Sequence, residues 1–378
     1  MSRMSRAACR FIVATLFSGL FLAPSAAYAQ EEKANILTPD GVMLKGVFYP
    51  STAKNAPTVI MLHPIGEGKS MKAPEWKNLA EVLNKAKYSV MMFDFRGHGE
   101  STSIDDPKAF WNARTTAGTM PNAVNVRSKE KDSIDVKDYI KQISAYAPVL
   151  VNDIAAVRAW LDRRNDTDKD CNTSSLIVIG AESGATLGAL WINAENYRYK
   201  YTPPGPMMKM QLDTRSEGRD IIAAVFLTAQ PLVEKRAFKL ESLLKSSCKD
   251  QGMAAAFVFG KQDTKGANLA KYLEKNLKVS KDSKKHAYIQ TAEVPDTNLT
   301  GMKLLVKGTK VDEGIVDYLK EVVDERKNTW VERDFPNSYY MWRLGPTSQM
   351  IPAKKLPSEG GKGEKNLKFD SYERFNFQ

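Results

Sequence analysis

The chain has 378 residues and a formal net charge of +11, because 55 Lys and Arg residues outnumber 44 Asp and Glu residues. The lysine-rich stretches 275–285 and 354–368 are interleaved with acids and hold few aromatic residues. That pattern is typical of a solvated surface and argues against a nucleic-acid groove. Contact with an anionic envelope surface is the weaker alternative.

The first 29 residues are typical of a secretory signal peptide. Three arginines precede an apolar segment, 11–22, that is too short to span a bilayer, and the stretch ends in Ala27-Tyr28-Ala29. We therefore expect cleavage before Gln30, a secreted or periplasmic location, and no transmembrane segment in the mature protein. Loss of these residues removes three positive charges and no acid, which leaves a net charge of +8.

The rest of the chain is long enough for one large domain with insertions. We predict that this domain covers residues 30–330 and that 331–378 form a C-terminal arm with a partly disordered tail. Cys9 leaves with the signal peptide, and Cys171 and Cys248 each precede a predicted strand. We expect these two cysteines at the same end of one sheet. Two alternatives stay open there: a disulfide between them, or two separate buried thiols.

The hydrophobic pattern predicts a hairpin followed by alternating strands and helices. An Asp-Gly turn at 40–41 lies between two alternating segments and predicts a hairpin over 34–49. Further strands are predicted at 57–62, 88–93, 175–179, 221–228, 253–260 and 287–294, and helices at 76–87, 149–164, 234–246, 267–277 and 311–327. Alternation of this kind predicts an α/β fold with a doubly wound, mostly parallel sheet and helices on both faces.

Two segments interrupt this alternation. Residues 102–147 are polar and contain two prolines, and residues 197–219 are irregular and rich in proline and methionine. A segment as long as the first, between two core elements, is usually an insertion that forms a lid or cap, or else is mobile. We expect the first to be lid-like.

Residues 175–191, SLIVIGAESGATLGALW, have the composition of a sharp turn between a strand and a helix. A β-branched run leads into a turn of small residues, and a helical pattern begins immediately afterwards. Glycines at 180 and 184 place Glu182 at the apex of this turn. Ser183 follows one position later.

Two more motifs accompany this turn. Residues 61–66, MLHPIG, end the first predicted parallel strand, and residues 93–101, FDFRGHGES, end the second. Together the three motifs resemble the α/β-hydrolase superfamily, in particular dienelactone hydrolases and esterases, over residues 34–327. The second motif matches the D-x-R-G-x-G-x-S turn of that family, where glycines permit a sharp exit from the strand and the arginine and serine hold the loop.

The resemblance implies roles for several residues. In the family the elbow is G-x-S-x-G with a catalytic serine at its apex, where this chain has Glu182. The loop at 61–66 lends a backbone N–H to the oxyanion hole, and because Pro64 has no N–H the donor here is expected to be Ile65. Asp263 follows the penultimate strand, as the catalytic acid of the family does. Its alternative role is to cap the next helix.

The catalytic base is missing from its expected place. The family supplies a histidine after the last strand, but residues 294–301 contain none. His286 precedes that strand and is expected to lie too far from the elbow, and His98 is expected to be a turn residue. Without a base to accept its proton, a serine hydroxyl is a poor nucleophile.

Two other arrangements stay open. If the elbow slips by one residue, Ser183 becomes the nucleophile, with the N–H of Gly184 as an oxyanion donor and His63 as an improvised base. Alternatively Glu182 itself acts, as an acid or base, as a covalent carboxylate, as a ligand anchor, or as a helix-capping relic of a catalytic site.

The leading hypothesis is thus an exported α/β-hydrolase-fold protein that is impaired as a serine hydrolase and binds a small-molecule ligand or a partner in the old site. The alternatives are an active esterase or dienelactone-hydrolase-like enzyme that uses Ser183 on an ester substrate, and an envelope-associated scaffold. There is no Walker loop, no zinc-spaced cluster and no dinucleotide fingerprint, so we expect no metal and no cofactor. Calcium bound by oxygen ligands stays open.

Overall fold

A computed structural model describes residues 31–112, 121–126, 131–196, 198–202, 211–230, 239–278, 288–326, 329–333, 339–341 and 350–352. The predicted signal peptide, His286 and most of the predicted tail lie outside these residues. Among the helices that the structure describes, none combines the length and the hydrophobicity needed to cross a bilayer.

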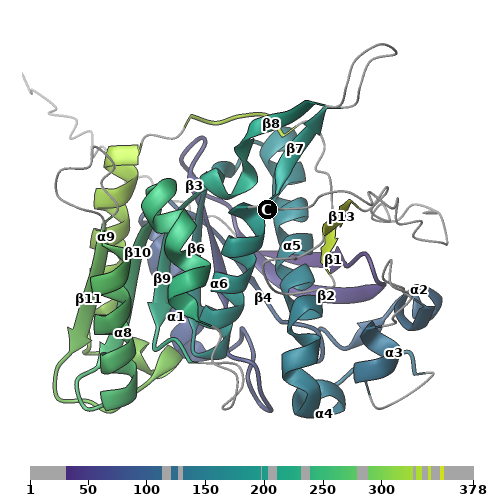
Figure 1. Cartoon of the computed structure of the whole chain (residues 1–378), viewed down its shortest axis with the longest axis horizontal. Helices are drawn as coiled ribbons and strands as arrows, with labels where there is room; N and C mark the ends of the chain where they lie inside the picture. Colours follow the sequence, from purple (N-terminus) through teal and green to yellow (C-terminus); the bar gives the residue numbers. More distant parts are fainter. Residues whose placement is uncertain are drawn as a thin grey trace, which may run out of the picture.

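A nine-stranded sheet forms the centre of the protein (Figure 1). Its strands are β1 (Glu32–Leu37), β2 (Val42–Tyr49), β3 (Pro57–Leu62), β4 (Ser89–Phe93), β5 (Ser103–Ile104), β6 (Asn172–Ala181), β9 (Ile221–Leu227), β10 (Ala254–Gly260) and β11 (Ile289–Val294). The order is β1-β2-β4-β3-β6-β9-β10-β11, and β5 pairs with β2. The β1–β2 hairpin and the β2–β4 pair are antiparallel, whereas all pairs from β4 to β11 are parallel. The predicted N-terminal hairpin and mostly parallel sheet are confirmed.

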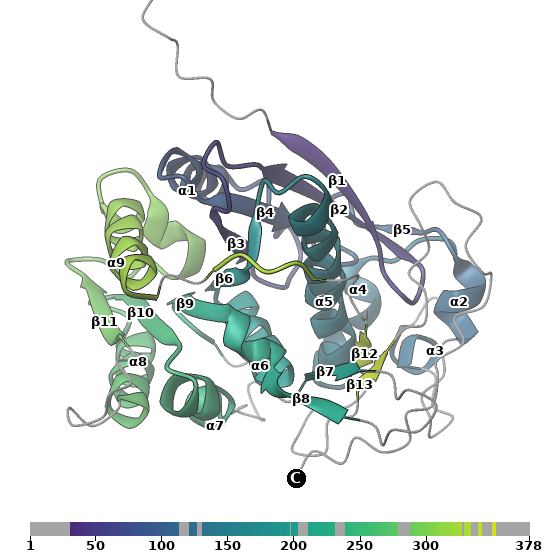
Figure 2. The same cartoon turned by 90° about the horizontal axis from the view of Figure 1, so that it is seen from above.

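Helices cover both faces of this sheet (Figure 2). One face carries α1 (Pro74–Lys85) and α9 (Val311–Arg326). The opposite face carries α5 (Ile143–Thr167), α6 (Ser183–Asn196), α7 (Leu240–Lys245) and α8 (Thr264–Leu277). A parallel sheet is buried on both faces, which is why its strands are continuous apolar runs in the sequence.

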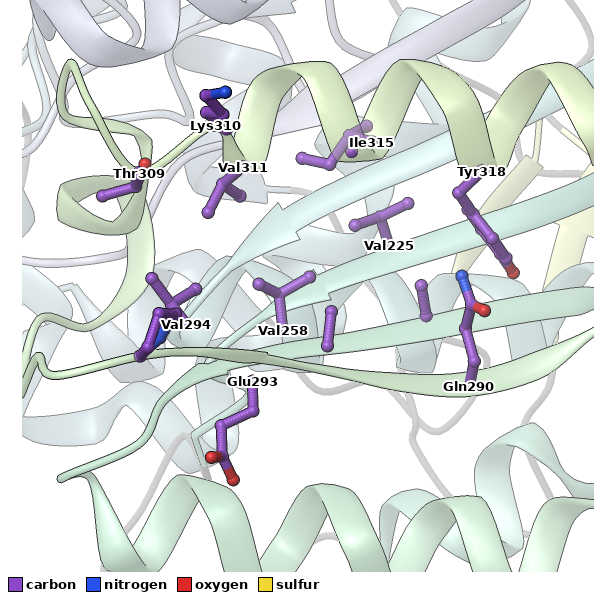
Figure 3. A pocket seen from close by; sticks show the side chains of 14 residues that line it. Val225, Val258, Gln290, Glu293, Val294, Thr309, Lys310, Val311, Ile315 and Tyr318 are labelled. Carbon is purple, nitrogen blue, oxygen red and sulfur yellow. The ribbon is translucent and has the colours of Figure 1, made fainter.

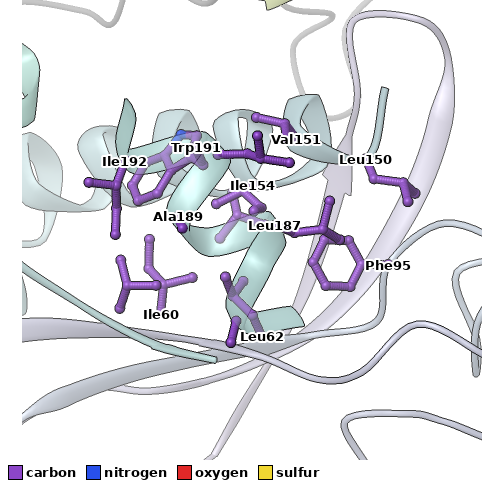
Figure 4. Close-up of a cluster of buried hydrophobic side chains, with 14 of the residues drawn as sticks. Ile60, Leu62, Phe95, Leu150, Val151, Ile154, Leu187, Ala189, Trp191 and Ile192 are labelled. Atoms are coloured by element: carbon purple, nitrogen blue, oxygen red, sulfur yellow. The ribbon is translucent and has the colours of Figure 1, made fainter. Parts of the chain in front are cut away.

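Side chains alternate between two hydrophobic cores, one on each face of the sheet. On β3, Ile60 and Leu62 point toward α5 and α6, while Val59 and Met61 point toward α1. Figure 4 shows Leu62 below Leu187 of α6 and Ile154 of α5, with Phe95 to the right. The two-residue period of a strand therefore supplies both cores from one segment.

The buried apolar side chains of the first insertion extend the main hydrophobic core on the face that carries α5 and α6. The insertion contains α2 (Pro107–Asn112), α3 (Pro121–Asn125), α4 (Val136–Tyr139) and the 3-10 helix η1 (Ile140–Gln142). Phe110 and Tyr139 are fully buried within it. Helix α5 begins at Ile143, before Pro148, whereas the sequence pattern predicts a start at residue 149. Here the proline lies inside the helix, so it does not mark its beginning.

The second insertion and the start of the C-terminal arm meet at the amino ends of the parallel strands. The hairpin β7 (Tyr199–Thr202) and β8 (Gln211–Ser216) leads into the 3-10 helix η2 (Glu217–Asp220). Arg333 of the arm donates hydrogen bonds to Asp220 at 2.7 Å and to Ser174 at 2.9 Å. Farther along, β12 (Tyr339–Met341) and β13 (Met350–Pro352) form a hairpin.

The two cysteines in the described part of the chain are buried. Cys171 and Cys248 are free thiols, and burial raises the pKa of each. This arrangement corresponds to the alternative of two separate thiols.

Candidate functional site

The candidate site lies at the carboxyl ends of β3, β6, β9 and β10, where β6 turns sharply into α6. Strand β6 ends at Ala181 and α6 begins at Ser183, so Glu182 alone connects them. Its φ is +51°, in the left-handed region that non-glycine residues seldom occupy. Such a conformation costs about 1–3 kcal/mol, and it is held here by the Glu182 N–H, which donates to Leu227 O at 2.9 Å.

Two glycines make this turn sterically possible. A Cβ on Gly180 would lie 2.6 Å from Ala185 Cα, and a Cβ on Gly184 would lie 2.5 Å from Leu62 O. Both positions therefore exclude every residue with a side chain while the helix stays this close to the strands. The glycines fix the register of the elbow with Glu182 at its apex, as the sequence pattern predicts, and a one-residue slip to Ser183 is not what the structure has.

The D-x-R-G-x-G-x-S turn stands beside this elbow and is held by a buried ion network. Arg96 is fully buried and donates to Asp40 at 2.6 Å and to Asp153 at 2.6 Å. Ser101 Oγ donates to Asp94 O at 2.7 Å. The predicted structural roles of the arginine and the serine are confirmed. Together with the strand order and the elbow, this turn decides the architecture.

The chain has the α/β-hydrolase fold.

At the apex of this α/β-hydrolase elbow, the Glu182 carboxylate is tied to the loop that follows the last strand. Thr300 Oγ1 donates to Glu182 Oε1 at 3.0 Å, from a point 118 residues away in the sequence. Gly301, with φ +55°, packs on the same carboxylate, and a Cβ there would lie 2.6 Å from Glu182 Cγ. The loop that lacks a histidine thus holds the apex residue directly. Sequence reasoning missed Thr300 and Gly301.

The backbone N–H that was predicted to stabilise an oxyanion donates to Ser183 instead. The Ile65 N–H donates to Ser183 Oγ at 2.7 Å. Ile65 therefore lies at the elbow as predicted, but its N–H is already bonded. Gly184 lies one residue further into α6. With Glu182 at the apex, the residue after it is Ser183, whose own N–H belongs to the unpaired first turn of the helix.

His63 binds the backbone through both ring nitrogens. Its Nδ1 lies 2.7 Å from Pro64 O, and the Phe95 N–H donates to its Nε2 at 3.1 Å. The ring is fully buried, and this burial, with a further contribution from His98, lowers the pKa of His63 to about 3. Its ring nitrogens are thus engaged by the backbone and not by the Ser183 hydroxyl.

His98 holds the neighbouring loop in place. The Gly66 N–H donates to His98 Nε2 at 3.1 Å, and His98 Nδ1 lies 3.1 Å from Arg96 O. Burial lowers the pKa of this imidazole, which is consistent with a neutral ring that accepts from the loop. His98 is the turn residue that the sequence motif predicts.

Asp263 lies after β10, in the position of a catalytic acid, and caps α8. The Gly266 N–H donates to Asp263 Oδ1 at 3.0 Å. Its other oxygen, Oδ2, is buried without a hydrogen-bond partner among the described residues, and so is the hydroxyl of Thr228 after β9. A buried carboxylate oxygen without a donor is uncommon in folded proteins.

Within the described part of the chain, no cluster of three or more His, Cys, Asp or Glu side chains has a metal-binding arrangement. The site instead brings together Glu182, Ser183, Ile65 and Thr300 through hydrogen bonds. His63 and Asp263 each form hydrogen bonds with backbone groups of residues near them in the sequence.

No protein-family model matches the chain, and no curated protein matches it significantly. Solved structures do match. A dienelactone hydrolase from Anabaena variabilis is 13% identical, with a TM-score of 0.46 over 79% of this chain and 98% of that one. An esterase from Pyrococcus furiosus is 15% identical, with a TM-score of 0.44 over 78% and 91%. A serine hydrolase without a lid from Xanthomonas campestris is 14% identical, with a TM-score of 0.41 over 78% and 94%. At this similarity the fold assignment depends on the strand order and the elbow of this chain itself.

Proposed function

We propose that the protein is an α/β-hydrolase-fold protein that no longer performs serine-hydrolase chemistry and that uses the old site to bind a ligand or a partner. The observation that carries the proposal is the apex of the elbow. A carboxylate stands where the nucleophilic serine of the fold belongs, and Thr300 and Gly301 hold it from the loop that would supply the base.

The two histidines that the structure describes support the same conclusion. Both histidines in the described part of the chain use their ring nitrogens on backbone groups, and burial lowers the pKa of each. A hydroxyl that transfers no proton to a base is a weak nucleophile. The Ser183 oxygen also accepts from Ile65 N–H, so the group that should stabilise an oxyanion is bonded to the candidate nucleophile itself.

A binding role is supported by acceptors that lack donors. Among the described residues, Asp263 Oδ2 and Thr228 Oγ1 are buried without hydrogen-bond partners after the adjacent strands β10 and β9, and Glu182 is half-buried after β6, the next strand of the sheet. Buried acceptors gain stability when a bound group brings N–H or O–H donors to them. We therefore propose a ligand or partner group that donates hydrogen bonds, such as an amine.

Labelling with a fluorophosphonate tests the loss of catalysis. We expect no stable adduct on the purified protein, and turnover of an aryl acetate no faster than that of the Ser183→Ala variant, because no base activates the hydroxyl. An active serine hydrolase labelled in parallel is the positive control. Stable labelling that disappears in Ser183→Ala would instead establish the alternative, an esterase that uses Ser183.

We also propose that the protein is exported, because residues 1–29 have the charge, length and ending of a cleavable signal peptide. In a Gram-negative host, we expect full-length expression to yield periplasmic protein whose N-terminus, determined by mass spectrometry, is Gln30. Recovery of uncleaved protein in the cytoplasm would contradict this proposal, and a variant with Arg3, Arg6 and Arg10 replaced by glutamate serves as the export-defective control.

A further inference from the structure

An apolar pocket of about 190 Å³ lies between α9 and the sheet (Figure 3). It is on the face that carries α1 and α9, whereas the elbow helix α6 packs on the opposite face. Figure 3 shows Val225 and Val258 of the strands beneath Val311 and Ile315 of the helix. The pocket is therefore separate from the site at the elbow.

The floor of the pocket is hollowed by two alanines, Ala256 and Ala292, on the two strands nearest the sheet edge. Ala256 of β10 pairs with Val225 of β9 on one side and with Gln290 of β11 on the other. Two residues along, Val258 pairs with Ala292. Strands favour β-branched and aromatic residues. Alanines in the two strands nearest the sheet edge leave a depression that larger side chains would fill.

The roof is one face of α9 with a gap in it. Positions 311, 314, 315 and 318 share a helix face, and three of them carry large buried side chains. The fourth is Gly314, a residue that destabilises a helix interior. No atom lies within 4 Å of the place where its Cβ would be, so close packing does not require a glycine there. Its effect is to leave the pocket open.

The deep lining offers hydrocarbon contacts and no unpaired hydrogen-bonding group. Tyr318, which closes one end, already donates its hydroxyl to Tyr288 O at 3.0 Å. Glu293 points away from the pocket toward α8, where Lys271 lies 3.6 Å from it. Gln290 and Lys310 are exposed at the rim. A suitable ligand is thus apolar where it is buried and carries at most one polar group, directed outward.

We propose that this pocket binds a small aromatic molecule, of about the size of a substituted benzene ring, with its ring under α9 and any hydroxyl at the rim near Gln290. An apolar cavity of about 150 Å³ lined by aliphatic and aromatic side chains stays free of water and binds benzene. Here the volume is somewhat larger and the deep lining is likewise aliphatic and aromatic, whereas the mouth at Gln290, Ala292 and Gly314 is exposed to solvent. Binding restores the dispersion contacts that the lining side chains lack on their open side.

The probes for the test are 4-fluorophenol, followed by fluorine NMR, and toluene, followed by the shift in thermal unfolding. We expect saturable line broadening and a higher unfolding temperature with the mature protein. Gly314→Leu and Ala292→Leu place a side chain in the pocket and should weaken binding at least about tenfold. Glu313→Leu adds the same side chain to an exposed neighbouring position outside the lining, and should bind as the unmodified protein does.

Folding of the filled variants is checked by their unfolding temperatures without ligand. Gly314→Leu should be at least as stable as the unmodified protein, since leucine favours a helix interior more than glycine does. If the mature protein shows no saturable effect with either probe, or if the two filled variants bind as well as Glu313→Leu does, the proposal is wrong. Because the labelling experiment reports on the elbow alone, the two proposals can fail separately.

Discussion

The Asp153→Ala variant is expected to lose about 3–5 kcal/mol of unfolding free energy, because it removes one partner from a buried ion pair. The Arg96 guanidinium is fully buried and donates to Asp153 through Nε at 2.9 Å and through Nη2 at 2.6 Å. Alanine leaves Nε without an acceptor and leaves Nη2 with Asp40 alone, at 2.9 Å, in a fully buried place. Urea unfolding followed by circular dichroism measures the loss.

An exposed ion pair of the same length is the matched control. Lys72 Nζ lies 2.6 Å from Glu100 Oε1, with side chains that are 59% and 61% exposed. Glu100→Ala should cost less than about 1 kcal/mol, because solvent screens the pair and side-chain entropy offsets the attraction. If the two variants lose similar amounts of unfolding free energy, then burial does not set the strength of the Arg96 network.

This network also explains why the D-x-R turn tolerates a buried arginine. Burial by itself would raise the pKa of Asp40. The positive charge of Arg96, together with hydrogen bonds from Arg96, Asn122 and Thr38, outweighs burial and lowers that pKa. Asp40 is the aspartate of the Asp-Gly hairpin turn. Asp40 therefore belongs to the N-terminal turn and also pairs with the buried Arg96. This ion pair joins the hairpin to the parallel sheet.

The sequence predicted most of the fold because local patterns decide it. Continuous apolar runs marked the parallel strands, and Gly180 and Gly184 fixed the elbow register, since only glycine fits beside the adjacent backbone. Helix α5 was the exception. Its apolar face predicted a start at residue 149, although the helix begins at Ile143 and contains Pro148.

Contacts between distant segments could not be predicted from these patterns. The Thr300 bond to Glu182 joins residues 118 apart, and both partners of Arg96 are more than fifty residues away from it. His63 was considered as an improvised base because of its place beside the elbow. Only the structure shows that Phe95 N–H and Pro64 O engage its two nitrogens. The pocket under α9 likewise depends on strand register, which sequence periodicity does not give.

A rebuilt triad gives the largest expected gain of activity. We expect the triple variant Glu182→Ser, Ser183→Ala, Thr300→His to react with a fluorophosphonate about 100-fold or more faster than the unmodified protein. The first change places a hydroxyl at the apex. The second frees Ile65 N–H to bind an oxyanion, and the third puts an imidazole where Thr300 now lies within 3.0 Å of the apex side chain.

Asp263 is the reason that three changes should suffice. Its Oδ2 is buried without a donor among the described residues after β10, which is the place of the acid that orients a catalytic imidazole. Glu182→Ser alone and Thr300→His alone are the controls, and both should stay near the unmodified rate because each lacks nucleophile or base. If the folded triple variant is not labelled, Asp263 serves α8 only as a cap. If Glu182→Ser alone is labelled as fast as the triple variant, a base already exists at the elbow, and the loss of catalysis would then depend on the apex residue alone.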